Sequence, residues 1–196
     1  MAPLDFKNAW TGMGEPLSPI TKTRLDRFNL LNATSEFLTQ AGLPVYCEPN
    51  LHFSKDTDDL FSGINKLTEQ YDFFNPTDKF DQYIVIGSCR DGDPIAIDTA
   101  NNDMIVQLDH EDLFNSSYFN SSITTLADFL IFFRDFEQEV LSGKGVDDSF
   151  NFTNIQFDQL KNKMFTADSK AITEEGFWKN ELDIMLSIRK ETFGIS

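Results

Sequence analysis

Short apolar runs separated by turn-forming residues occupy the middle of the chain. QYIVIGS (82–88), DPIAID (93–98) and MIVQLD (104–109) are rich in Ile and Val, which favour strands. The linkers RDGD and TANND are short and contain residues that tolerate left-handed backbone angles. The pattern therefore predicts three consecutive antiparallel strands over residues 82–108.

Before these strands, apolar residues at helical spacing predict one or two helices over residues 21–41. Thr34 is a candidate cap for the second helix, and Gly42 followed by Pro44 ends it. Residues 45–75 mix acidic residues with short apolar pairs, which indicates one or two short strands joined by loops. NPTDKFD, which follows, is typical of a turn. We expect about the first 20 residues to form an extended arm.

After the strands, the polar stretch 110–123 predicts a connection, and an amphipathic helix follows it. Ser122, Thr124 or Thr125 is expected to cap this helix, which ends before SGKG. Its expected buried stripe consists of Leu126, Phe129, Leu130, Phe133, Phe136 and Val140. Two more helices are expected at 154–165 and 174–190. The expected buried side of the last one consists of Phe177, Trp178, Leu182, Met185 and Ile188.

Consecutive strands flanked by helices indicate an α+β fold with a mixed, mostly antiparallel sheet. The 196 residues suit a single domain, 1–196. Forty per cent of the residues are hydrophobic, which is enough for a sizeable core, and 20 of them are Phe. We therefore expect a core built from large, rigid rings.

The formal net charge of −16 restricts the kinds of partner. Phosphates would be repelled, so the charge argues against direct binding of nucleic acid or of an anionic membrane. A basic protein partner remains compatible with it, as does acidity that serves solubility alone.

The N-terminus, the short apolar runs and the cysteines indicate a cytoplasmic protein. The N-terminus lacks the pattern of a signal peptide, and no apolar run approaches the length of a membrane span. The two cysteines are too few for a disulfide framework.

The RDGD turn allows three interpretations. A calcium loop would begin at Asp98, but it lacks a glycine at its sixth position and runs into a predicted strand. A phosphate loop would need more glycines and a following helix. An Asp-Gly hairpin turn needs nothing further, so the hairpin is the preferred interpretation.

Candidate catalytic groups are sparse. The possible Cys-His pairs are Cys89 with His110 and Cys47 with His52, and neither pair lies in a known sequence signature. No G-x-S-x-G, H-E-x-x-H or Walker A pattern occurs. We therefore expect no catalytic residue, no cofactor and no metal, and we interpret Cys89 as a small apolar residue at the end of a strand.

Acidic residues concentrate around the predicted turns. We expect a docking face made of solvent-exposed side chains that would meet a basic partner. Its candidate residues are Asp91, Asp93, Asp103, Glu111 and Asp112. The alternative is that charges gather at turns only because turns are solvated.

Several segments, taken in order, resemble the SUKH superfamily. They are LTQAGLP (38–44), YIVIGSCRDGDPIAID (83–98), VQLDHED (106–112) and NSSITTLADFL (120–130), with a looser similarity at FWKNEL (177–182). The resemblance implies an α+β fold without catalysis. It also implies structural roles for the matching residues Gly42, Pro44, Gly87, Gly92 and Asp98.

Many bacterial members of this superfamily are immunity proteins of polymorphic toxin systems, and others are fungal regulators or binding scaffolds. The resemblance therefore implies a cytoplasmic immunity protein that binds and neutralises a cognate toxin, with nucleases as one toxin class. The alternative is a non-catalytic scaffold or regulatory protein of the same fold. The oligomeric state stays open.

Overall fold

A computed structural model describes residues 1–11, 15–71, 79–142 and 148–194. Its helices are α1 (Pro3–Trp10), α2 (Lys22–Leu25), α3 (Asn32–Gln40), α4 (Leu67–Gln70), the 3-10 helix η1 (Lys79–Gln82), α5 (Ile123–Leu141), α6 (Asn154–Thr173) and α7 (Phe177–Phe193). Its strands are β1 (Leu17–Ser18), β2 (Leu43–Pro44), β3 (Tyr46–Cys47), β4 (Leu51–Phe53), β5 (Asn65–Lys66), β6 (Tyr83–Ser88), β7 (Pro94–Asp98), β8 (Met104–Asp109) and β9 (Asn115–Asn120). The α+β class is confirmed.

The main sheet is antiparallel and follows the order β3-β4-β6-β7-β8-β9. β4 and β5 pair with different halves of β6, while β1 and β2 form a separate pair. The predicted meander of three strands is confirmed as β6, β7 and β8. All five side chains of β7 are buried, because the sheet has packed layers on both of its faces.

Strand β9 was missed by the sequence prediction, which placed a polar connection over 110–123. Its sequence, NSSYFN, is mostly polar, and only Phe119 and Asn120 are buried. Such residues have little intrinsic preference for strands. Pairing with β8 from Ile105 to Asp109 supplies the hydrogen bonds that make this segment a strand.

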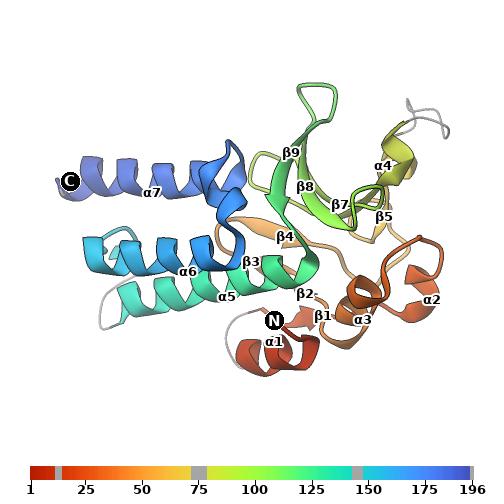
Figure 1. Cartoon of the computed structure of the whole chain (residues 1–196), viewed down its shortest axis with the longest axis horizontal. Coiled ribbons are helices and arrows are strands. Elements are labelled where there is room, and N and C mark those ends of the chain that lie inside the picture. The colour runs from red at the N-terminus through yellow and green to blue at the C-terminus, as the bar shows by residue number, and fades with distance from the viewer. Residues whose placement is uncertain (12–14, 72–78, 143–147, 195–196) are drawn as a thin grey trace.

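Figure 1 shows α5, α6 and α7 lying beside one another on one side of the molecule, next to the curved sheet. Ser122 caps α5 as predicted, and its hydroxyl accepts a hydrogen bond from the Thr125 amide. The predicted stripe of α5, which includes Phe129 and Phe133, is buried. It packs with the Ile residues on one face of the sheet and with Trp178 of α7.

The N-terminal prediction was wrong in two respects. Instead of an extended arm, the chain begins with α1, whose Phe6 and Trp10 are buried, and Phe6 contacts the ring of Phe37 in α3. Thr34 does not cap α3, because the helix already begins at Asn32 and Thr34 is buried inside it. Gly42 does follow the end of α3 with a left-handed φ of 69°.

Helix α6 continues to Thr173, beyond the predicted end at 165, and is interrupted at Asp168. The Asp168 carboxylate accepts hydrogen bonds from the Tyr118 hydroxyl and the Ser121 amide, which join this kink to the end of β9. Residues 45–75 contain β3, β4, β5 and α4, while most of the expected turn at 75–81 lies outside the described residues.

The hydrogen bonds of the turn between β6 and β7 confirm that RDGD forms a hairpin turn. The Gly92 amide donates to the Cys89 carbonyl, and the Cys89 amide donates to the Asp93 carbonyl. Gly92 has a φ of 85°, which fits a three-residue turn whose last residue is left-handed. Strand β6 has a bulge between Val85 and Gly87, and a Cβ at Gly87 would lie 2.2 Å from the His52 carbonyl oxygen.

Candidate functional site

The predicted docking residues do not form one face. Asp91 and Asp93 lie at the β6–β7 turn, and Glu111 and Asp112 lie at the β8–β9 turn, so these four share one end of the sheet. Asp103 lies in the β7–β8 turn at the opposite end. Successive turns of a meander alternate between the two ends, and β7 separates them by roughly 15–20 Å.

Asp93 is only 8% exposed, so the expectation of a free side chain was wrong. Its carboxylate accepts hydrogen bonds from Gln107 Nε2 (2.7 Å) and from the His110 amide (3.0 Å). It also lies 2.6 Å from His110 Nδ1. Burial acts to raise the pKa of Asp93, but the hydrogen bonds from His110 and Gln107 outweigh it and lower that pKa. Asp93 therefore fastens β7 to β8.

Asp103 is 2% exposed, which again contradicts the expectation. One of its carboxylate oxygens accepts a hydrogen bond of 2.7 Å from the Leu31 amide, just before α3. Asp103 and Asn102 both have a φ of 56°, as a tight turn with two left-handed residues requires. This carboxylate therefore ties the β7–β8 turn to the N-terminal helices.

Asp91, Glu111 and Asp112 are exposed, and we call these three residues the acidic rim. The Asp109 carboxylate accepts hydrogen bonds from the Glu111 and Asp112 amides and so fixes the turn that carries them. Leu113, the next residue, is 85% exposed and left-handed, with a φ of 51°. Of the predicted docking residues, only the acidic rim is free to meet a partner.

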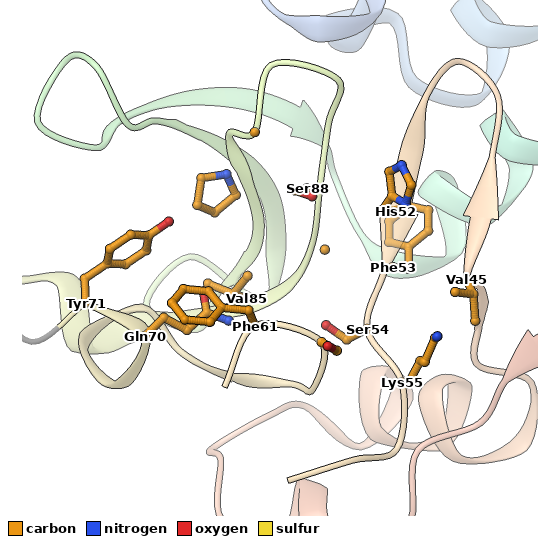
Figure 2. Close-up of a pocket in the computed structure, with 14 residues that line it drawn as sticks. Val45, His52, Phe53, Ser54, Lys55, Phe61, Gln70, Tyr71, Val85 and Ser88 are labelled. Carbon is orange, nitrogen blue, oxygen red and sulfur yellow. The ribbon is translucent and has the colours of Figure 1, made fainter. Parts of the chain in front are cut away.

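A pocket of about 380 Å³ lies on the sheet face that carries Val85 (Figure 2). Phe61, Gln70 and Tyr71 line one side of it, while His52 and Ser54 lie on the other. Gln70 and Ser54 already hydrogen-bond to backbone carbonyls of Leu60 and Gly63. Among the described residues, its wall mixes aromatic and neutral polar groups with Lys55 and includes no carboxylate.

A second cavity, of about 440 Å³, opens between α5 and α7 and we call it the interhelical cleft. The β3–β4 turn, the β6–β7 turn and the segment before α6 complete its wall. Its apolar lining residues are Pro49, Phe133, Phe136, Leu141, Phe150, Ile184, Met185 and Ile188, and its charged ones are Glu48, Arg90, Glu137 and Glu181. The cleft is therefore an apolar slot with acidic groups in its wall.

Burial raises the pKa values of two carboxyl groups in the interhelical cleft. Arg90 Nη2 donates to Glu181 Oε1 at 2.6 Å, yet burial of Glu181 still raises the pKa of its carboxyl. Burial and the nearby charge of Glu48 raise the pKa of Glu137 to about 7. Glu48 is held in place by hydrogen bonds from the Tyr46 hydroxyl and the Asn50 amide.

The sequence prediction missed this cleft. Its one local signal was a carboxylate at the edge of an apolar helical stripe, as with Glu137 beside Phe133 and Phe136 and Glu181 beside Leu182. Nothing in the local pattern indicates that these two helices face each other.

Neither cysteine has the surroundings of a nucleophile. Burial raises the pKa of both thiols, and the thiolate is the reactive form. His110 bonds to Asp93, whereas the Cys89 sulfur accepts from Gln107 Nε2 at 3.6 Å.

In the described parts of the chain, no three or more His, Cys, Asp or Glu side chains are grouped as metal ligands. None of the helices described is both long and apolar enough to cross a membrane.

Comparison with known proteins identifies a family. The family model described as "SUKH-4 immunity protein" matches residues 9–184. Searches of curated proteins and of solved structures each gave no significant match. The matched range includes nearly every described helix and strand, from β1 to the middle of α7. The chain belongs to the SUKH-4 immunity protein family, part of the SUKH superfamily.

Proposed function

We propose that this protein is a cytoplasmic immunity protein that neutralises a cognate toxin by forming a stoichiometric complex with it. The observation that carries the proposal is the family match over residues 9–184. The buried thiols, with their raised pKa values, support binding rather than catalysis as the way it acts.

The net charge supports a basic toxin as the partner. At −16 the protein attracts a cationic surface over long range and speeds encounter with it. Toxins that cleave nucleic acid commonly present a basic face to their substrate, so a nuclease is the toxin class that fits the charge best. In this proposal the protein covers that face and keeps nucleic acid away from it.

The test is co-purification with the toxin domain encoded by the neighbouring gene. We expect a complex of defined stoichiometry when the mixture is analysed by gel filtration with light scattering. A matched control uses the toxin domain of an unrelated system, which should elute separately. If the cognate pair also elutes separately at micromolar concentration, the immunity proposal is wrong and a scaffold role with another partner replaces it.

A further inference from the structure

The described wall of the interhelical cleft carries more negative than positive charge. Among the described residues, three carboxylates and one guanidinium line it, and the guanidinium of Arg90 is already paired with Glu181. The Glu181 side chain is only 7% exposed, so this pair forms a buried part of the wall. The charges of Glu48 and Glu137 are left without a cation in the described part of the wall.

Glu137 differs from the other two carboxylates of the cleft. Among the described residues it forms no hydrogen bond and no ion pair, although it lies on α5 between the apolar side chains of Phe133 and Leu141. A carboxylate held without a partner beside an apolar slot is costly to ionise, and an incoming cation would remove that cost. A cation that binds beside Glu137 would therefore be favoured by the ionised form of this carboxylate.

We propose that the interhelical cleft receives an arginine side chain of a protein partner. The aliphatic stem would lie along Phe136 and Ile188, and the guanidinium would meet Glu137 and the fixed carboxylate of Glu48. This inference rests on the proposed function, because it names the anchor by which the toxin is held. A buried arginine in a pocket is a frequent centre of binding energy at interfaces.

Arginine fits the cleft better than other cations. A guanidinium is more weakly hydrated than an ammonium, stacks on aromatic rings and binds carboxylates through two parallel hydrogen bonds. A metal ion is a poorer fit, since no three His, Cys, Asp or Glu side chains among the described residues converge as ligands.

A second copy of this chain is a poor donor of that arginine. The chain has five arginines, and each is occupied within its own fold. Arg24, Arg27, Arg90 and Arg134 pair with carboxylates, and Arg189 is buried against Phe152. The occupant is therefore a different protein, in agreement with a basic toxin.

The cleft is tested with a probe that needs no toxin. N-acetyl-arginine methylamide is titrated into ¹⁵N-labelled protein, and amide shifts are followed by NMR. We expect saturable shifts at 48, 50, 133–141 and 181–188 with a dissociation constant of roughly millimolar order. The citrulline analogue has the same shape without the charge and should leave these amides unmoved. Equal shifts with both compounds, or none in the cleft, overturn the inference.

Two variants locate the binding. Glu137→Gln should weaken binding of the arginine probe about five- to tenfold. The matched Glu139→Gln variant makes the same change of charge on the exposed face of α5 and should bind like the wild type. Ile184→Trp fills the slot without changing charge and should abolish the shifts, with far-UV circular dichroism confirming that the fold is retained. Unchanged probe binding in both cleft variants overturns the inference.

The toxin complex separates the two proposals. If the neighbouring toxin binds tightly and Glu137→Gln changes its affinity no more than Glu139→Gln does, the cleft inference fails while the immunity function stands. If the arginine probe binds and the toxin does not, the immunity function fails while the chemistry of the cleft stands.

Discussion

Single carboxylates in this protein have different roles according to what lies within hydrogen-bonding distance of them. Asp93 and Asp103 accept hydrogen bonds from distant parts of the chain and hold the sheet and the N-terminal helices together. Glu137, by contrast, is partly buried and accepts no such bond from the described residues. The sequence shows all three only as acids near turns or on a helix, because burial and partners are properties of the folded chain.

Replacing Glu137 should stabilise the protein in a pH-dependent way. Its pKa is raised from 4.5 to about 7, so the folded state retains a proton that the unfolded state releases between these values. Stability is therefore lost as the pH rises through that window. Glu137→Gln should raise the free energy of unfolding by about 1–3 kcal/mol at pH 8, and by less at pH 5.

Urea unfolding of both proteins at the two pH values measures this effect. Glu139→Gln, on the exposed face of the same helix, serves as control and should show no such pH-dependent gain. A Glu137→Gln variant that is less stable than the wild type at pH 8 would show that its carboxylate has a stabilising partner.

At the scale of elements, strong local sequence patterns were sufficient to predict a helix or a strand, and weak patterns were not. The Ile- and Val-rich runs predicted β6, β7 and β8, and the apolar stripe predicted α5 with its Ser122 cap. Strand β9 and helix α1 lack such patterns and form because neighbouring elements bury Phe119 and Phe6. Their assignment depends on tertiary contacts that no window of sequence contains.

Truncating a ring in the centre of α5 should be costly. Phe129 is fully buried, and its ring centroid lies 5.2 Å from that of Trp178. Phe129→Ala should lower the free energy of unfolding by about 3–5 kcal/mol, as is usual for a buried aromatic residue. Phe165→Ala, in an exposed position on α6, is the control and should change it by less than about 0.5 kcal/mol. Similar losses in the two variants would mean that α5 does not cover the core.

At the scale of the whole molecule, the family and the fold class were predictable, but the candidate binding surfaces were not. The meander itself places the β6–β7 and β8–β9 turns at one end and the β7–β8 turn at the other, so Asp103 could have been separated from Asp91 by topology alone. The interhelical cleft is different. Its wall comes from residues 48–50, 90, 133–141, 149–150 and 181–188, which only the tertiary fold brings together.

The acidic rim should control how fast a toxin associates. Changing Asp91 and Asp112 to Asn and Glu111 to Gln removes exposed charge, and exposed charge acts mainly on encounter. We expect association about tenfold slower at low salt and a flatter dependence on ionic strength, with little change in melting temperature. Surface plasmon resonance across a salt series measures both quantities.

A control for the rim removes equal charge elsewhere. Asp5→Asn, Asp158→Asn and Glu191→Gln alter exposed acids outside the rim. If the control slows association as much as the rim variant does, net charge alone attracts the partner and the rim has no special part.

In the proposed function, this protein neutralises its toxin by occupying it. The most direct measurement titrates the protein into a fixed, nanomolar amount of the cognate toxin domain and follows the remaining toxic activity on its substrate. We expect a linear loss of activity that ends at a fixed stoichiometric ratio. Activity should be recovered when the complex is dissociated by denaturant and the toxin is refolded alone. Complete and lasting inactivation by far less than a stoichiometric amount of the protein would mean that it acts as a catalyst and not by occupying the toxin.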